Sequence, residues 1–276
     1  MAGRELTSIR SPRVKAARRL AKRAFRRQDR RFLAEGPQAV REALDLPGVL
    51  VELFATTEAE TRHADLIGRA EASGAPVLRV SSEIMADLAQ TVTPQGLLAV
   101  CAFIDVALDQ ALAGTPSLVT VLAQVRDPGN AGTVLRTADA AGSDLVIFTD
   151  ACVDPYNGKC VRASAGSLFH VPLVVGPRFD SLIGSLAAAG LTVLAADGSA
   201  QRSLDEAIDG GQLARPTAWV FGNEAWGLPD AVLGLVDEVV SVPIYGRAES
   251  LNLATAAAVC LYSSARAHRT PTPSTG

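Results

Sequence analysis

The chain has 276 residues, of which 48% are hydrophobic, and a formal net charge of −3. This length and apolar content suffice for a buried core and predict two domains or one large one. The N-terminus lacks the apolar core of a signal peptide, and no apolar run is long enough to span a bilayer, so we expect a cytoplasmic protein.

The charges are distributed unevenly. Residues 1–31 hold 12 of the 26 Lys/Arg and only 2 of the 29 Asp/Glu, which leaves the remainder strongly acidic. A basic arm on an acidic body indicates a polyanionic partner, although the net charge alone argues against nucleic acid.

Within this arm, Ser11 and Pro12 predict the start of one amphipathic helix. Its cations are expected to contact the phosphates of such a partner: Arg10, Arg13, Lys15, Arg18, Arg19, Lys22, Arg23, Arg26 and Arg27. The alternative is that this helix packs on its own domain.

From residue 32 to residue 105, apolar strands alternate with helical segments, which predicts an α/β domain. Residues 106–116 are predicted to be a linker. The alternation resumes over residues 117–268 with longer apolar strands, such as "LVTVLAQV" and "TAWVFG". Continuous apolar strands are typical of a parallel sheet covered on both faces. Residues 269–276 are expected to be a disordered tail.

The four cysteines form no CxxC pair, so buried free thiols are favoured over disulfides and metal ligands. No metal site is expected. The three histidines, His63, His170 and His268, do not stand near a serine in a hydrolase motif. No GxGxxG follows any strand, which argues against a dinucleotide-binding oxidoreductase.

Three loops that follow predicted strands carry glycine and polar side chains: "RDPGNAGTVLR", "NEAWGLP" and "YGRAESLNLA". In parallel sheets, ligands bind beyond the carboxyl ends of the strands. Singly, each loop is a weak signal, because Asn130 could cap a helix and Asn223 with Glu224 could form a turn. Arg136 is harder to explain, since its neighbours Val134, Leu135 and Ala138 are expected to be buried and an arginine near a core usually has an anionic partner.

Together these loops resemble the three motifs of the SpoU/TrmH family of S-adenosylmethionine-dependent RNA 2'-O-ribose methyltransferases. The first motif corresponds to Asn130, Gly132, Arg136 and Gly142, the second to "FGNEAWGL", and the third to Pro243, Ser250, Leu251 and Asn252. A fourth stretch, "DPYNGKCVRASAGSLFHVPL", is also similar to the family. The resemblance covers about residues 117–266, and the N-terminal region resembles the family's substrate-binding domain.

This resemblance implies an N-terminal L30e-like (ribosomal-protein-like) α/β substrate-binding domain and a C-terminal SPOUT α/β domain with a parallel sheet and a trefoil knot. It also implies a homodimer and S-adenosylmethionine as cofactor. The implied catalytic residues are Asn130, Arg136, Glu224, Ser250 and Asn252. The implied cofactor-binding residues are Ala195, Phe221, Gly222, Asn223, Gly227, Val242, Ile244, Leu251 and Leu253, and Lys159, Arg162 and Ser164 are implied to bind RNA.

The family's chemistry is methyl transfer to a ribose hydroxyl, which requires the reacting atoms to be held in line. Arg136 is expected to bind phosphate and stabilise the developing alkoxide, because a guanidinium is always protonated and therefore a poor general base. The resemblance implies 23S ribosomal RNA as substrate, because some tRNA-modifying members of the family carry a bulky polar residue where this chain has Gly129, and the N-terminal domain resembles that of the members that act on ribosomal RNA. The alternatives are a tRNA 2'-O-methyltransferase and a non-catalytic RNA-binding or ribosome assembly factor.

Overall fold

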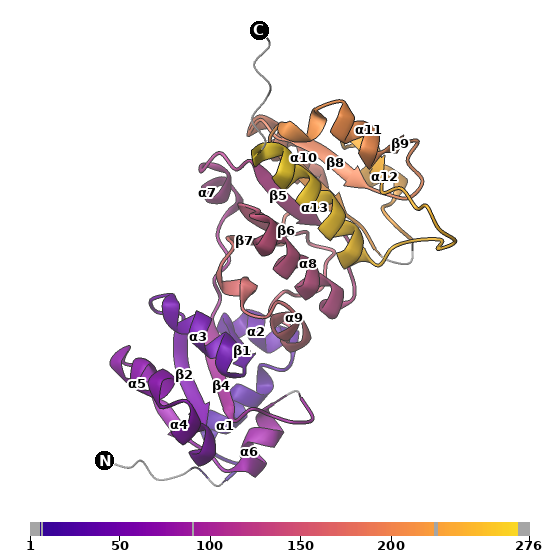
Figure 1. Cartoon of the computed structure of the whole chain (residues 1–276). Coiled ribbons are helices and arrows are strands. Elements are labelled where there is room, and N and C mark those ends of the chain that lie inside the picture. Colours follow the sequence, from indigo (N-terminus) through magenta and orange to yellow (C-terminus); the bar gives the residue numbers. More distant parts are fainter. Residues whose placement is uncertain (1–5, 7, 90, 224–225, 270–276) are drawn as a thin grey trace. The chain divides into compact units, whose positions relative to one another are not determined.

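The computed structural model describes residue 6 and residues 8–89, 91–223 and 226–269 (Figure 1). The chain divides into two compact units. The first unit comprises Met1–Ile104 with Tyr156–His170, and the second comprises Asp105–Pro155 with Val171–Gly276. The expected tail lies outside the described residues except for Arg269, which ends the last helix.

The basic segment forms two helices, α1 (Pro12–Arg19) and α2 (Arg23–Asp29), rather than the single helix expected. Val14, Ala17 and Leu20 are buried in the apolar core of the first unit. Arg26 is also buried, and its Nη1 donates to the carbonyl oxygens of Leu20 and Ala21 at 2.9 and 2.8 Å. The segment therefore packs on its own unit, as the alternative interpretation held.

The sheet of the first unit has the strand order β1-β4-β2-β3. β4 (Leu97–Ala102) runs antiparallel to both β1 (Arg31–Glu35) and β2 (Leu50–Ala55), whereas β2 and β3 (Val77–Arg79) are parallel. The helices of this unit that follow α2 are α3 (Pro37–Asp45), α4 (Thr57–Arg62), α5 (Ala64–Ala72) and α6 (Ser82–Leu88).

A segment from the second half of the sequence completes the first unit. It holds α9 (Gly158–Ala163) and the 3-10 helix η1 (Ser167–Phe169). Tyr156 stacks on Phe103 with ring centroids 3.9 Å apart and lies 4.8 Å from Phe32. Its hydroxyl accepts a hydrogen bond from the Ile104 amide at 3.0 Å. The expected continuous domain of residues 117–268 is thus interrupted at Tyr156–His170.

The second unit is built on a parallel sheet of seven strands in the order β7-β6-β5-β10-β8-β11-β9. The strands are β5 (Leu118–Leu122), β6 (Leu145–Phe148), β7 (Leu173–Val175), β8 (Thr192–Ala196), β9 (Arg202–Ser203), β10 (Thr217–Phe221) and β11 (Glu238–Ser241). The prediction of a parallel sheet is confirmed. β9 was not predicted, because two residues carry no periodic signal.

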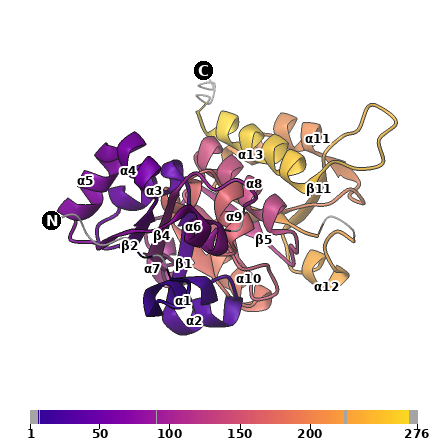
Figure 2. The same ribbon diagram turned by 90° about the horizontal axis from the view of Figure 1, so that it is seen from below.

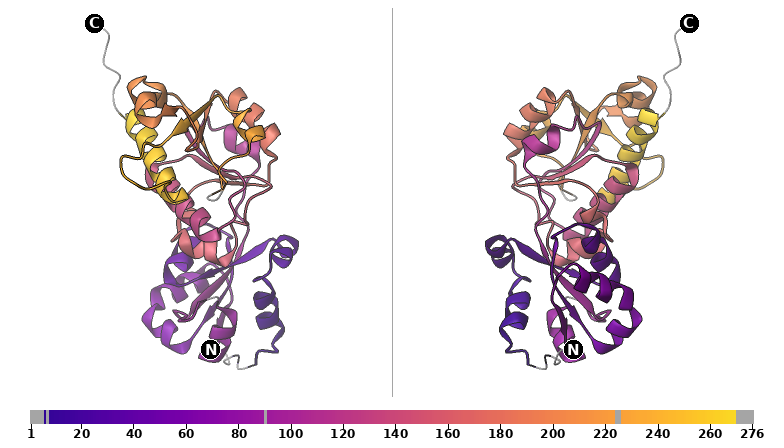
Figure 3. Two further views of the ribbon diagram at one scale, coloured as in Figure 1. Left: turned by 90° about the vertical axis from the view of Figure 1, so that its right-hand side faces the viewer. Right: turned by 90° about the vertical axis from the view of Figure 1, so that its left-hand side faces the viewer.

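Helices cover both faces of this sheet (Figure 3). They are α7 (Leu108–Leu112), α8 (Pro128–Ala141), α10 (Phe179–Ala188), α11 (Leu204–Asp209), α12 (Asp230–Leu233) and α13 (Leu253–Arg269), with the 3-10 helix η2 (Gln212–Ala214). The expected linker contains α7, and Leu108, Ala111 and Leu112 pack against the core.

α13 lies alongside α8 (Figures 1 and 2). It is tied to the sheet by the indole nitrogen of Trp219, which donates to the Ser264 hydroxyl at 2.8 Å. Phe221 pairs in register with Leu122 on one side and Ala196 on the other, so β5, β10 and β8 end at the same level. The loops that follow these strands therefore leave the same edge of the sheet.

All four cysteines are buried free thiols, as predicted. Burial raises the pKa of the Cys101 and Cys260 thiols, which keeps both protonated and unreactive at neutral pH.

Candidate functional site

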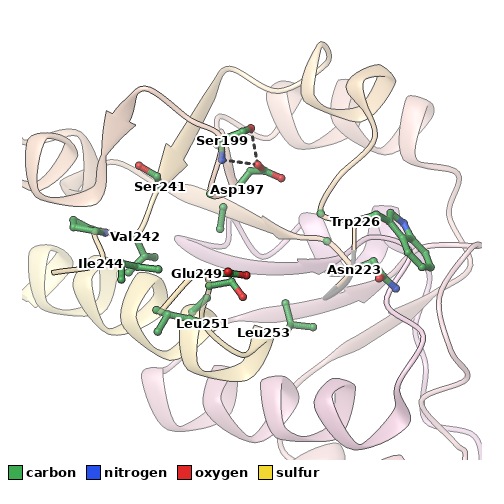
Figure 4. A pocket seen from close by; sticks show the side chains of 17 residues that line it. Asp197, Ser199, Asn223, Trp226, Ser241, Val242, Ile244, Glu249, Leu251 and Leu253 are labelled. Atoms are coloured by element: carbon green, nitrogen blue, oxygen red, sulfur yellow. Dashed lines mark hydrogen bonds between the residues drawn. The ribbon is translucent and has the colours of Figure 1, made fainter. Parts of the chain in front are cut away.

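A cavity of about 650 Å³ lies in the second unit, at the carboxyl ends of β8, β10 and β11 (Figure 4). Four stretches of chain line it: Ala196–Ser199 after β8, the Gly222–Gly227 turn after β10, Ser241–Ile244 after β11, and the approach to α13 from Glu249 to Ala256. This is where the topology of a parallel sheet places a ligand site.

The turn after β10 brings two backbone segments unusually close. The Asn223 amide donates to the Gly227 carbonyl at 3.0 Å, and the Gly227 amide returns a hydrogen bond to the Asn223 carbonyl at 2.9 Å. A Cβ on Gly222 would lie 2.7 Å from the Gly227 oxygen and 2.6 Å from Leu228 Cγ. Gly227 itself has φ +67°. Both glycines are therefore required by the turn, which leaves backbone exposed to the cavity.

Asp197 joins two walls of the cavity. One carboxylate oxygen accepts hydrogen bonds from the Ser199 amide at 2.9 Å and hydroxyl at 2.7 Å, and the other accepts from the Leu228 amide at 3.3 Å. Burial raises the pKa of Asp197, but these hydrogen bonds lower it, and the net result is a pKa below the ordinary value. The cavity therefore contains an ionised carboxylate at neutral pH.

A second group of polar side chains comes from the first and third motifs. The Asn252 Nδ2 donates to Asn130 Oδ1 at 3.2 Å, and Asn252 Oδ1 accepts from the Ala254 amide at the start of α13. Asp127 is the N-cap of α8, and its carboxylate accepts from the Asn130 amide at 2.8 Å. The Asn130 side chain is thus not a helix cap, and it meets Asn252 across 122 residues of sequence.

Arg136 is exposed on α8, contrary to the expectation of a position near the core. Val134, Leu135 and Ala138 are buried as predicted. At 100° per residue they lie on the other side of the helix, which turns the guanidinium towards solvent. Gly142 ends α8 with φ +81°, as the motif implied.

The structure brings most of the implied cofactor-binding residues together. The cavity is lined by Gly222, Asn223, Gly227, Val242, Ile244, Leu251 and Leu253, and also by Ser250. Ala195 and Phe221 do not line it, because both are buried one position earlier in β8 and β10. Glu224 lies outside the described residues.

Sequence reasoning missed several lining residues, notably Asp197, Ser199, Trp226 and Glu249. Asp197 could have been predicted, because it directly follows the apolar strand "LTVLAA" at the edge of the sheet where ligands bind.

A hydrogen bond of Tyr245 fixes the loop before α13. The Tyr245 hydroxyl donates to the Asp205 carboxylate at 2.5 Å.

The residues expected to bind RNA lie in the first unit and differ in exposure. Arg10, Arg13, Lys15, Arg18, Arg19, Lys22, Arg23, Arg27 and Lys159 are exposed. Three of them have acidic neighbours: Arg13 with Glu52, Arg18 with Asp87, and Arg19 with Asp29.

The prediction that Arg26 and Ser164 contact RNA is wrong. Both residues are buried, and their side chains donate hydrogen bonds to backbone carbonyl oxygens. Arg162 forms an ion pair with Glu35 at 3.5 Å and is only partly exposed. A structural role in the first unit accounts for these three residues.

Among the described residues, no group of three or more His, Cys, Asp or Glu side chains could hold a metal ion. None of the described helices has the length and apolar character needed to cross a membrane.

The fold and the site define a parallel α/β protein with a ligand cavity at the carboxyl ends of β8, β10 and β11, lined by four stretches of chain. Residues 117–262 match the model of the SpoU rRNA Methylase family, and residues 11–99 match that of an MRM3-like substrate binding domain. The chain belongs to the SpoU rRNA methylase family, whose members are RNA methyltransferases dependent on S-adenosylmethionine.

The relatives match over nearly their whole length. The chain is 34% identical to the 23S rRNA (guanosine(2553)-2'-O)-methyltransferase RlmP of Bacillus subtilis, covering 94% of this chain and 98% of the relative. It is 30% identical to the 23S rRNA (guanosine-2'-O-)-methyltransferase RlmB of Bordetella pertussis, covering 85% and 92%. The crystal structure of an AdoMet-bound rRNA methyltransferase from Sinorhizobium meliloti superposes with a TM-score of 0.81 at 30% identity, covering 95% and 97%.

Proposed function

We propose that this protein transfers a methyl group from S-adenosylmethionine to a ribose 2'-hydroxyl of 23S ribosomal RNA. The observation that carries the proposal is that residues from three separate sequence motifs meet in one region, with Asn130 beside Asn252 and the second and third motifs lining one cavity. The relatives named for this reaction on 23S rRNA support the choice of substrate over tRNA.

The cavity fits the methyl donor in size and chemistry. Glycine backbone at Gly222 and Gly227 lets a flat ring approach closely, and Val242, Ile244 and Leu251 offer apolar contact. The Asp197 carboxylate supplies a hydrogen-bond acceptor beside Gly227, where it accepts from the Leu228 amide. When bound there, the donor would supply the activated methyl group.

The polar groups outside the cavity would act on RNA. Asn130, whose side-chain oxygen accepts a hydrogen bond from Asn252 Nδ2, would orient the target ribose. Arg136 would bind an adjacent phosphate and stabilise negative charge that develops on the 2'-oxygen. A guanidinium does not accept a proton at neutral pH, so the hydroxyl proton would pass to a substrate phosphate or to water. Ser250 and Glu224 complete the proposed catalytic set.

RNA would be held mainly by the exposed cations of α1, α2 and their connection. Lys15, Lys22, Arg23 and Arg27 are exposed there, with Lys159 on α9 in the same unit. Such contacts neutralise phosphates and position RNA without reading its bases. We propose that these helices act as part of the substrate-binding unit and not as a free basic arm, because α1 packs into the core of the first unit. A 23S rRNA substrate also supports a cytoplasmic location.

We further propose a homodimer formed through α13. Val259 and Tyr262, one turn apart on this helix, are 38% and 54% exposed, and large apolar side chains on one helix face favour an interface. The trefoil knot that the family resemblance implies stays a proposal. Light scattering at micromolar concentration tests the dimer, and a monomer mass would contradict it.

The reaction is tested by incubating the purified protein with S-adenosylmethionine and unmethylated 23S rRNA and mapping ribose methylation. The expected result is one new 2'-O-methylated nucleotide. Methylation of tRNA but not rRNA would favour the tRNA alternative. RNA binding without donor binding or methyl transfer would favour the non-catalytic assembly factor.

A further inference from the structure

Trp226 stands out among the exposed apolar residues of the second unit. Its side chain is 59% exposed, and it lines the donor cavity, which the exposed Ile208 and Leu235 do not. The other tryptophan, Trp219, is fully buried and bonded to Ser264. In Figure 4 the Trp226 indole lies at the Asn223 end of the cavity, and Val242 and Ile244 lie at the other end.

The turn that carries Trp226 is tied to the loop that leads into the first motif. The backbone pairing of Asn223 with Gly227 holds the base of the turn that carries Trp226. The Asn223 Nδ2 donates to the Gln124 carbonyl at 3.4 Å, which ties this turn to the loop between β5 and α8. That same loop leads to Asn130. This hydrogen bond holds the turn that carries Trp226 on the same edge of the sheet as the first motif, the edge at which we propose that the RNA ribose enters.

We infer that Trp226 is a stacking platform for the nucleobase of the RNA nucleotide that is methylated, an inference that rests on the proposed function. An indole offers a large flat face, and nucleobases stack on aromatic side chains with little dependence on sequence. Stacking of the base holds the nucleotide equally well before and during methyl transfer, so it contributes to RNA binding and not to the chemical step. The donor's own adenine belongs at the apolar Val242 and Ile244 end of the cavity.

The protein has two tryptophans, and Trp219 is buried, so contact of RNA with the exposed Trp226 can be measured as a change in tryptophan fluorescence. The probe is an RNA fragment that contains the counterpart of guanosine 2553, the nucleotide in the name of the Bacillus subtilis relative, and it carries either guanine or an abasic ribose at that nucleotide. With the demethylated donor S-adenosylhomocysteine at saturation, the guanine RNA quenches the exposed Trp226 emission and the abasic RNA quenches it much less. In Trp226→Phe only Trp219 remains as an indole, and the quench disappears.

Kinetics give a second measurement. Trp226→Leu keeps an apolar side chain but removes the aromatic face, so KM for the guanine RNA rises roughly 5- to 150-fold while kcat stays nearly unchanged. Trp226→Phe retains most of the affinity. On the abasic RNA, wild type and Trp226→Leu have the same KM. Ile208→Ala is the matched control for removal of an exposed apolar side chain, and it changes neither measurement.

Several outcomes overturn the inference. A quench that is complete with S-adenosylhomocysteine alone would assign the indole to the donor's adenine. An equal KM increase on guanine and abasic RNA, or a change of oligomeric mass in Trp226→Leu, would assign it to the fold or to the dimer. If RNA quenches Trp226 but no RNA is methylated, the stacking stands and the proposed reaction fails.

Discussion

Replacing Gly222 with alanine should damage the donor cavity through a clash that can be located to the atom. The new Cβ would lie 2.7 Å from the Gly227 carbonyl oxygen and 2.6 Å from Leu228 Cγ, where contacts of 3.4 Å or more are ordinary. Leu228 Cγ can shift, but the Gly227 oxygen is fixed by its hydrogen bond from the Asn223 amide. The turn must open by most of an ångström to admit the methyl group.

Overpacking of this kind costs about 1–3 kcal/mol. If the native turn is needed for binding, the Kd for S-adenosylmethionine rises roughly 5- to 150-fold. Isothermal calorimetry measures the Kd, and a thermal melt reports whether the variant is still folded. Gly184→Ala is the matched control, since a Cβ at this position in α10 meets nothing within 4 Å. Wild-type donor affinity in a folded Gly222→Ala variant would refute the assignment of this turn to the cavity wall.

Three further variants test other parts of the site. Arg136→Ala should raise the activation free energy of methyl transfer by about 2.7–4 kcal/mol, which lowers kcat roughly 100- to 900-fold. The Kd for the donor should not change, and near-normal turnover would exclude the proposed role of Arg136. Replacing Lys15, Lys22, Arg23 and Arg27 with glutamine should reduce the log–log salt slope of RNA binding by about 0.7 for each phosphate that is no longer neutralised, whereas Arg178→Gln in the second unit should not. Asp197 contributes stability that is present above its ordinary pKa of 3.8 and is lost as pH falls through the lowered folded value. Asp197→Asn should therefore narrow the difference in melting temperature between about pH 7 and about pH 3, and an unchanged difference would show that the hydrogen bonds from Ser199 and Leu228 contribute little.

Most of the fold could be predicted from local patterns, because long apolar runs are typical of buried parallel strands. The runs that contain β5, β6, β8 and β10 coincide with strands of the central sheet. The sequence could not show that Tyr156–His170 belongs to the first unit, since a buried aromatic residue gives the same pattern whichever core receives it. The packing of α1 and α2 was obscured for a related reason: their few apolar residues are spaced among many cations.

Site residues that belong to a sequence motif were predicted, whereas those whose role depends on the three-dimensional arrangement of the loops were missed. Asn130 and Asn252 were named from the family resemblance, and their side chains meet. The exposure of Arg136 could not be read from the burial of its neighbours, because a helix turns by 100° per residue. Asp197 was missed because it lies outside the family motifs, and Trp226 because it is not one of the motif positions that the resemblance names, although it stands within "FGNEAWGL".

The placement of Tyr156–His170 has a consequence for how the two units could be exchanged between related proteins. The chain passes from one unit to the other at three points, after residues 104, 155 and 170, so no single cut or junction separates them. A fragment beginning near residue 105 would carry Tyr156 and Phe169 without Phe32, their ring partner in the first unit. A chimera with another relative's substrate-binding unit would have to transplant residues 1–104 and 156–170 together. Recombination at the apparent boundary between the two halves would leave an aromatic cluster split between two parents.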